Sequence, residues 1–157
     1  MRPNWDQYFL AIAHLVSSRS HDEQTQVGCV IVNEDNHIVG VGYNGFPSGV
    51  DDKELPRVRP GKYAYMIHAE QNAVSNMITK EKNLTAYITA HPCKTCANLL
   101  WQNGVRLIIV DSNGVFYSMN EDDIKAINVL QKNGLSLIEL EFDNAIFKNL
   151  EVKTNVN

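Results

Sequence analysis

Two short segments of the sequence contain residue types that bind metals and move protons. One is His-Ala-Glu at residues 68–70, and the other is Pro-Cys-Lys-Thr-Cys at residues 92–96. Cys93 and Cys96 are three positions apart, so the start of a helix places both on one side. The helix dipole also lowers the pKa of thiols at that end. The two cysteines therefore form half of a predicted tetrahedral metal site.

His68 is the most direct candidate for a third ligand, at the start of another predicted helix. Three protein ligands with an open fourth position are typical of catalytic zinc, which lowers the pKa of a water in that position to about 7. Glu70 follows the histidine by two residues, where its carboxylate can hydrogen-bond such a water and pass its proton to a substrate. We predict a zinc site of His68, Cys93 and Cys96, with Glu70 as the catalytic proton carrier.

Plainer interpretations of the same residues remain open. A Cys-x-x-Cys pair alone can be a redox motif, although the thioredoxin-type context is missing here. It can also be half of a closed structural zinc site, for which His91 is the nearest fourth ligand. A glutamate after a histidine is commonly a solvated acid in the first turn of a helix. The two segments together are more specific than either alone.

The elements that must position these residues can be predicted from apolar spacing and turn residues. Proline at a helix start and Asn-Gly at a helix end mark helix boundaries, and β-branched runs mark strands. Helices are predicted over residues 5–18, 68–79, 92–103 and 121–132, and strands over 27–32, 38–43, 84–89, 105–110 and 135–140. A leading hairpin followed by alternating helices and strands predicts an α/β fold with one mixed sheet covered by helices. The segment 44–61, rich in proline and glycine, is predicted to be a functional loop.

Length and composition limit the class of protein. The chain has 157 residues, of which 44% are hydrophobic and 20% charged, so one domain is expected over residues 1–150, followed by a polar tail at 151–157. No apolar run approaches the about 20 residues of a membrane span, and the N-terminus turns polar too early for a signal peptide. A net charge of −4 argues against a general nucleic-acid binder. Three cysteines without a secretion signal favour a reduced, intracellular protein.

At the His-Ala-Glu and Pro-Cys-x-x-Cys segments, the sequence resembles the cytidine/deoxycytidylate deaminase superfamily, whose members hydrolyse the exocyclic amine of cytosine or adenine. Val-Gly-Tyr-Asn-Gly-Phe-Pro-Ser-Gly at residues 41–49 and Lys-Tyr at 62–63 resemble the deoxycytidylate (dCMP) deaminases within it. So do Ser-Arg-Ser at 18–20 and Gln-Val-Gly at 26–28. The resemblance covers roughly residues 5–140. It implies a three-layer α-β-α, cytidine-deaminase-like fold with a five-stranded mixed sheet.

The resemblance implies an enzyme that hydrolyses dCMP to dUMP and ammonia and supplies dUMP for thymidylate synthesis. It implies one Zn²⁺ per subunit, and Glu70 as the residue that moves the proton. The residues expected to bind the substrate are Asn44 at the deoxyribose, Ala69 and Pro92 at the edge of the base, and Val27 and Tyr117. A plain turn residue is the alternative for Asn44, and a core or surface aromatic is the alternative for Tyr117 or its neighbour Phe116.

The resemblance also implies regulation by nucleotides. The expected activator is dCTP with Mg²⁺ and the expected inhibitor is dTTP, in a homo-hexamer of the cytoplasm (the host cytoplasm if the protein is viral). The effector site is expected to use Arg19, Tyr43, Asn44, Gly45 and Phe46. Candidate cations for nucleotide phosphates are Arg19, Lys53, Arg57, Arg59, Lys62 and Arg106, among which Arg19 is the first choice because it ends the first predicted helix beside the sheet. No membrane or nucleic-acid partner is expected.

Rival functions can be separated by the same features. A tRNA adenosine deaminase would need a basic surface, whereas this chain has 14 Lys and Arg against 18 Asp and Glu. A free-nucleoside cytidine deaminase would lack the Gly-Tyr-Asn-Gly and Lys-Tyr segments, and deaminase domains of riboflavin synthesis belong to the same superfamily. A non-catalytic zinc module that only binds nucleotides or partners would leave Glu70 idle.

Overall fold

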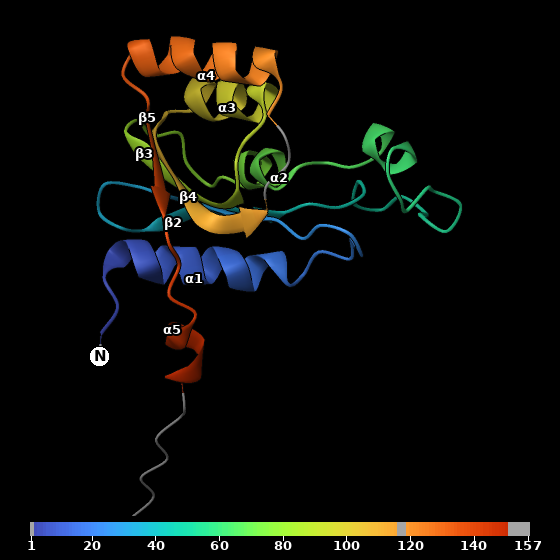
Figure 1. Ribbon diagram of the computed structural model, residues 1–157, viewed down its shortest axis with the longest axis horizontal. Helices are drawn as coiled ribbons and strands as arrows, with labels where there is room; N and C mark the ends of the chain where they lie inside the picture. Colours follow the sequence, from blue (N-terminus) through green and yellow to red (C-terminus); the bar gives the residue numbers. More distant parts are fainter. Residues whose placement is uncertain (1, 116–118, 151–157) are drawn as a thin grey trace, which may run out of the picture.

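The computed structural model describes residues 2–115 and 119–150 (Figure 1). Tyr117 and Phe116, the predicted wall of the base site, lie outside the described residues, as does the predicted tail at 151–157. Among the residues described, no helix combines the length and the apolar character that crossing a bilayer requires.

The chain alternates helices and strands in the predicted order, with two short additions. The helices are α1 (Trp5–Ser17), α2 (Ala69–Ser75), α3 (Lys94–Gln102), α4 (Glu121–Lys132) and α5 (Ala145–Lys148), with a 3-10 helix η1 (Gly61–Ala64). The strands are β1 (Gly28–Val32), β2 (Ile38–Tyr43), β3 (Leu84–Ala90), β4 (Val105–Val115) and β5 (Ser136–Leu140). The additions, η1 and α5, are single turns, too short for apolar periodicity to predict.

The largest differences from the predicted boundaries are at the C-terminal ends of α2 and β4. The helix predicted over 68–79 ends earlier, at Ser75. The Asn76 side chain donates to the Val41 carbonyl (3.0 Å), and the backbone N–H of Ile78 donates to the Val39 carbonyl (3.1 Å), so the chain leaves the helix to pair with the outer edge of β2. The strand predicted to end at residue 110 continues further, because residue 115 pairs with residue 90 after an irregularity in the register.

The five strands form one mixed sheet in the order β2-β1-β3-β4-β5. β1 runs antiparallel to both β2 and β3, whereas β3, β4 and β5 are parallel to one another. The register places Val41, Val30, Tyr87, Ile109 and Ile138 in one row across the sheet. The parallel half requires the chain to cross over the sheet between strands, and α3 and α4 make these crossings.

Helices cover both faces of the sheet, which gives three layers (Figure 1). α1 lies on one face, and its Phe9 and Leu10 pack with Val30 of β1 and Ile109 of β4 in one apolar cluster. α2, α3 and α4 lie on the other face over a second cluster, which contains Cys29, Ala73, Ile88, Ala97, Ile108 and Ile127. Alternate residues of each strand therefore belong to different cores, as the pleat requires.

Close contact between helix and strand sets the position of α2. A Cβ atom at Gly42 of β2 would come within 2.3 Å of the backbone nitrogen of Ala73 in α2, so a side chain there would push the helix away.

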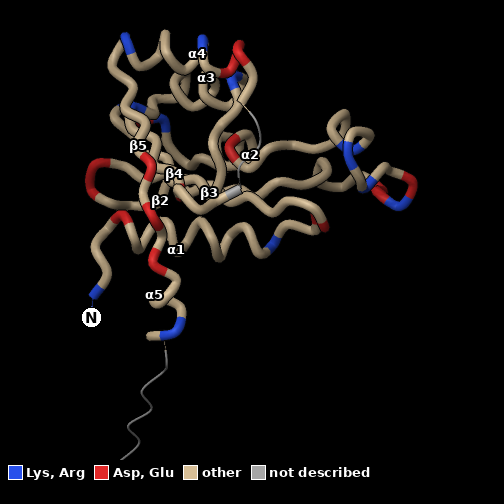
Figure 2. Tube along the Cα trace, viewed as in Figure 1, with Lys and Arg blue, Asp and Glu red and all other residues tan. Residues whose placement is uncertain are grey.

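The segment between β2 and α2, residues 44–68, projects from the body of the molecule, and we name it the projecting segment. It contains acidic and basic residues in a mixed arrangement (Figure 2).

Candidate metal centre and active site

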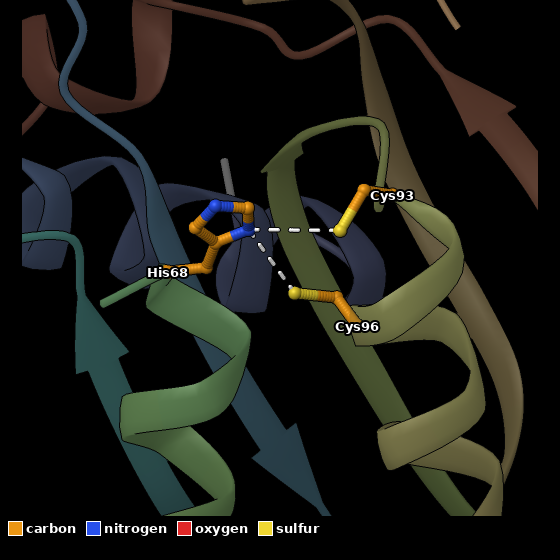
Figure 3. A group of neighbouring side chains, drawn as sticks. All are labelled: His68, Cys93 and Cys96. Atoms are coloured by element: carbon orange, nitrogen blue, oxygen red, sulfur yellow. Dashed lines mark hydrogen bonds between the residues drawn. The ribbon is translucent and has the colours of Figure 1, made fainter. Parts of the chain in front are cut away.

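The imidazole of His68 faces the thiols of Cys93 and Cys96 (Figure 3). Its Nδ1 atom lies 3.3 Å from Cys96 Sγ and 3.7 Å from Cys93 Sγ, and the three ligand atoms all lie within 4.8 Å of one another. These separations suit one zinc ion, whose bonds to sulfur and nitrogen are about 2.3 and 2.0 Å long. Within residues 2–115 and 119–150, this is the one group of three or more histidine, cysteine or acidic side chains so arranged.

Each ligand is placed by the start of a helix. His68 directly precedes α2, and Cys93 directly precedes α3. Cys96 lies in the first turn of α3, so both sulfurs are on one side of that helix. The helix begins at Lys94 and not at Pro92, where it was predicted to open, so the proline belongs to the loop that follows β3.

A buried carboxylate joins the starts of two helices beside the metal ligands. Asp123 Oδ1 accepts a hydrogen bond from the backbone N–H of Lys94 (2.8 Å), the residue after the ligand Cys93. Its Oδ2 accepts from the backbone N–H of Asn120 (3.0 Å), and the Asn120 side chain in turn caps α4. This role of Asp123 cannot be predicted from the sequence, because an acid in the first turn of a helix commonly stabilises only its own helix.

The pKa values of the two cysteines are shifted in opposite directions. The Cys96 thiol donates a hydrogen bond to the Cys93 sulfur, which lowers the pKa of Cys93 to about 4; burial opposes this shift and His68 adds to it. The same hydrogen bond, together with burial, raises the pKa of Cys96. A divalent cation favours the thiolate form of both residues and displaces the proton of that hydrogen bond. The pair is therefore suited to metal binding.

Glu70 is a buried carboxyl beside the ligands, with 2% of its surface exposed. Burial raises the pKa of Glu70, whereas its own backbone N–H and the neighbouring His68 oppose this rise. Its carboxylate does not belong to the ligand cluster. A buried carboxyl that is not one of the metal ligands and has a raised pKa is suited to take up and release a proton.

A cavity opens beside the ligands, and we name it the metal-side cavity. Its walls are formed by Thr25, Val27, Asn44, His68, Ala69, Glu70 and Ala90. The predicted substrate residues Val27, Asn44 and Ala69 thus lie around the same space as the metal ligand His68 and the acid Glu70. Pro92 is buried and is not one of the lining residues, so its contact with the base remains a prediction without support from the cavity.

Asn44 organises the wall of the metal-side cavity through its hydrogen bonds. Its Oδ1 accepts from the backbone N–H of Val27 (2.8 Å), and its Nδ2 donates to the backbone carbonyl of Thr25 (2.8 Å). Its own backbone carbonyl accepts from the Ser20 hydroxyl (2.8 Å). Asn44 is therefore more than a turn residue, since it fixes the segment 20–27 along the cavity.

A second cavity of about 610 Å³ lies next to residue 44, and we name it the loop-side cavity. Four of the five predicted effector residues line it, namely Arg19, Tyr43, Gly45 and Phe46. Asn44 was predicted for both sites, but it lines only the metal-side cavity, because its side chain is turned toward residues 25 and 27. Lining residues that the sequence analysis missed include His21, Asp52, Asn72 and Asn76.

A buried ion pair links the segment 20–27 to the projecting segment. Lys62 Nζ lies 2.7 and 2.8 Å from the two carboxylate oxygens of Asp22, and both side chains are 3% exposed. Asp22 Oδ1 also accepts from the backbone N–H groups of Gln24 (2.8 Å) and Thr25 (3.0 Å). Lys62, a predicted phosphate ligand, is thus committed to Asp22. No local pattern in the sequence indicates this pairing of two loop residues.

The alternative metal site is not formed. His91 Nε2 lies 2.9 Å from Glu139 Oε1 of β5, and His91 is outside the ligand cluster. The third side chain that converges on the cysteines is His68. A simple dithiol redox motif does not require this histidine, so the arrangement favours a metal site over a redox pair.

Known proteins are similar to this chain in sequence. Residues 3–112 match the family described as the cytidine and deoxycytidylate deaminase zinc-binding region. Human deoxycytidylate deaminase is 43% identical over 116 residues, which are 69% of this chain and 65% of the human protein. A probable deoxycytidylate deaminase of Caenorhabditis elegans is 46% identical over 125 residues, which are 75% of this chain and 59% of that protein. The chain thus spans somewhat less than two thirds of the length of these relatives.

A solved structure extends the comparison to the fold. The dCMP deaminase of cyanophage S-TIM5, solved in complex with dCMP and dUMP, superposes with a TM-score of 0.70 at 26% identity, over 89% of this chain and 99% of that one. The predicted three-layer fold with a five-stranded mixed sheet, of the cytidine-deaminase type, is confirmed. Because the family pattern spans most of the sequence and its histidine and cysteines converge in the structure, this chain belongs to the family of the cytidine and deoxycytidylate deaminase zinc-binding region.

Proposed function

We propose that this protein is a zinc-dependent dCMP deaminase, which hydrolyses dCMP to dUMP and ammonia. The proposal rests on one observation: the metal ligand His68, the buried acid Glu70 and the amide of Asn44 line a single cavity, and His68 also faces the two cysteine ligands. Similarity to proteins named deoxycytidylate deaminase, and to a structure that contains dCMP and dUMP, supports this substrate.

The donor set suits zinc. Two thiolates and one imidazole are ligands that zinc prefers, and three protein ligands leave one tetrahedral position open. Zinc in such a site supplies Lewis acidity that makes water nucleophilic at neutral pH. We propose one zinc ion per chain, since residues 2–115 and 119–150 contain one such cluster.

Glu70 is the proposed proton carrier. In the hydrolysis, a water oxygen adds to C4 of the cytosine and the bond from C4 to the amine breaks. Glu70 takes the first proton from the water and gives it to N3, then takes the proton of the new C4 hydroxyl and gives it to the departing amine. The carboxylate ends as it began, and both protons of the water are accounted for.

The wall of the metal-side cavity is proposed to hold the nucleoside. Asn44 uses one amide hydrogen and one oxygen lone pair in its bonds to residues 25 and 27, so its second hydrogen and second lone pair remain for the deoxyribose. The backbone of Ala69 and the side chain of Val27, which line the same cavity, are proposed to contact the base.

We also propose that the loop-side cavity binds the effectors, dCTP with Mg²⁺ as the activator and dTTP as the inhibitor, in a homo-hexamer. Its volume of about 610 Å³ lies within the range of ligand pockets. Arg19 lies over the ring of Tyr43, 6.0 Å from its centre, and offers a cation at this cavity. The product dUMP would serve thymidylate synthesis. A cytoplasmic location is part of the proposal, and the three unpaired cysteines support it.

An activity assay on the zinc-loaded protein tests the catalytic proposal. Loss of cytosine absorbance and release of one ammonia per dUMP are expected with dCMP, and a chelator should abolish both until zinc is restored. Failure of the zinc-loaded protein to deaminate dCMP, deoxycytidine or cytosine in single-stranded DNA would refute the proposal and favour a non-catalytic nucleotide-binding module. Preferential turnover of a nucleic acid would move the protein to another branch of the family.

A further inference from the structure

The proposed substrate carries a phosphate, and the metal-side cavity offers no cation for it. Its lining residues include no lysine or arginine; they are Thr25, Val27, Asn44, His68, Ala69, Glu70 and Ala90. The whole chain has a net charge of −4, so the general field does not attract a phosphate. If dCMP binds as proposed, with its base at the metal and its sugar at Asn44, a basic side chain at the rim must neutralise the phosphate.

The contacts of the candidate cations remove three of them from this role. Lys62 is buried in its ion pair with Asp22. Arg19 lines the loop-side cavity and lies over the ring of Tyr43. Arg57 lies over the ring of Phe46, and its Nη2 atom lies 3.3 Å from Asp52 Oδ1. Both partners line the loop-side cavity.

Two more candidates lie against other parts of the structure. The guanidinium of Arg106 stacks on the indole of Trp101 at 3.6 Å and donates to the carbonyls of Trp101 and Val105. Lys53 lies at an exposed turn of the projecting segment, where its backbone N–H donates to Asp51. Within the described structure, these contacts involve none of the residues that line the metal-side cavity.

Arg59 is different, because it is anchored on the wall of the metal-side cavity. Its Nη2 donates a hydrogen bond to the hydroxyl of Thr25, one of the lining residues. Its backbone N–H donates to the side-chain oxygen of Gln24 (3.0 Å). Asp22, itself fixed by Lys62, accepts from the backbone N–H groups of both Gln24 and Thr25. The segment that receives the Arg59 side chain is therefore held in place by a buried ion pair.

We infer that Arg59 binds the 5′-phosphate of the substrate and makes the enzyme select nucleotides over nucleosides. The inference rests on the proposed deamination of dCMP. A guanidinium has five N–H donors, of which the bond to Thr25 takes one, so a fork of donors remains for two phosphate oxygens. Since the Thr25 hydroxyl accepts from Arg59, its own hydrogen is free to donate to the same phosphate.

Kinetics on a matched pair of substrates test this role. For Arg59→Ala, kcat/KM with dCMP is expected to fall about 10- to 100-fold, the size of a lost hydrogen-bonded charge contact, whereas kcat/KM with deoxycytidine should stay unchanged. Arg59→Lys should retain part of the preference, because it keeps the charge without the fork. Lys53→Ala, which removes one exposed cation from the same projecting segment, is the control and should leave the preference for dCMP intact.

Binding of the product provides a readout that is independent of turnover. By calorimetry, Arg59→Ala should weaken dUMP by a similar factor and leave deoxyuridine unaffected. Equal losses for dCMP and deoxycytidine would show that Arg59 only supports the fold, and an unchanged preference would place the phosphate elsewhere; either result overturns the inference. A wild type that deaminates neither compound would instead refute the proposed function, so the two failures are distinguishable.

Discussion

The metal-side and loop-side cavities meet at Asn44, yet they are built from different kinds of structure. Around the metal-side cavity, Ala69, Glu70 and Ala90 belong to α2 and β3 and are buried. Residues 45–52 form nearly half of the wall of the loop-side cavity, and within the described structure the regular pairing of this segment is an isolated bridge between Gly45 and Ile67.

The difference suits the two tasks that we propose for the cavities. Proton transfer and metal binding require side chains held within a fraction of an ångström, and helix starts packed on a sheet provide this rigidity. A regulatory ligand acts only by favouring one of several states, which requires a segment held by few bonds. Asn44 lies at the boundary, with its side chain on the metal side and its chain neighbours on the loop side. If this division holds, a substitution at one cavity should change its function and leave that of the other cavity intact.

Loss of a metal ligand should have the largest effect and should abolish the function of the metal side. Cys96→Ala is expected to lose its zinc and to reduce deamination to background, because metal binding to this site depends on all three ligands. Metal analysis and initial rates measure the outcome. Cys29→Ala is the matched control, since this cysteine of β1 is buried outside the cluster and its loss should leave the zinc in place. Full zinc occupancy in Cys96→Ala would contradict the site.

Glu70→Gln should separate the chemistry from the metal. The variant keeps the size of the side chain and the ligand set, so zinc content and thermal stability should stay close to wild type. Removal of the proton carrier is expected to lower kcat about 10²- to 10⁴-fold. The exposed Glu121, which pairs with Lys125, serves as the control in Glu121→Gln and should leave kcat unchanged. Wild-type turnover in Glu70→Gln would remove the catalytic assignment.

The three candidate metal ligands could be predicted from the sequence because their positions follow from local structure. A histidine before one helix and two cysteines around the start of another need only the helix geometry and a sheet that brings both helices to one edge. The number and mixed direction of the strands followed from the same alternation of elements. The ends of the elements were less predictable. The helix α2 ends where the Asn76 side chain donates a hydrogen bond to Val41 at the edge of β2, a partner that is distant in the sequence.

The supports of the two cavities could not be predicted, because each depends on a contact between residues far apart in the chain. The ion pair of Asp22 and Lys62 joins two loops, and Asp123 reaches from α4 to the backbone of Lys94. Such side chains look like ordinary surface charges in a sequence. Burial distinguishes them, and burial becomes known only when the loops are placed.

Breaking the buried ion pair should destabilise the segment 20–27, which contributes His21 to the loop-side cavity and Thr25 and Val27 to the metal-side cavity. Lys62→Met leaves the Asp22 carboxylate buried without its partner, and loss of one member of a buried pair costs about 3–5 kcal/mol in the free energy of unfolding. Urea unfolding measures this cost. The double variant Asp22→Asn/Lys62→Met removes the isolated charge and should recover part of the stability. If Lys62→Met were as stable as wild type, the pair would have no structural role.

A change confined to the loop side should alter regulation and leave the chemistry intact. Under the proposed regulation, wild-type rates rise sigmoidally with dCMP and become hyperbolic with dCTP and Mg²⁺. Phe46→Ala removes an aromatic wall of the loop-side cavity and should reduce the shift of half-saturation caused by dCTP, which for typical coupling is about 5- to 150-fold. Its maximal rate should stay near wild type. Identical curves for the wild type with and without each triphosphate would end the regulatory proposal and leave the catalytic one in place.

The smallest expected effect concerns the stability in acid of the segment 20–27, which contributes residues to both cavities. Burial raises the pKa of Asp22, but the hydrogen bonds from Lys62 and from two backbone N–H groups outweigh it, so the pKa of the folded protein lies below the usual 3.8. A carboxyl of this kind stabilises the fold fully above its unfolded pKa, and the contribution disappears as the pH falls through the folded pKa. The free energy of unfolding from urea titrations at pH 7, 5, 4 and 3 should therefore decline more steeply in wild type than in Asp22→Asn. The neighbours His21, Glu23 and Arg57 are the same in both proteins, so the difference between the two curves reports the loss of the Asp22 carboxylate and of its bond with Lys62. Parallel curves would show that the pair holds the segment without any preference for the ionised carboxylate.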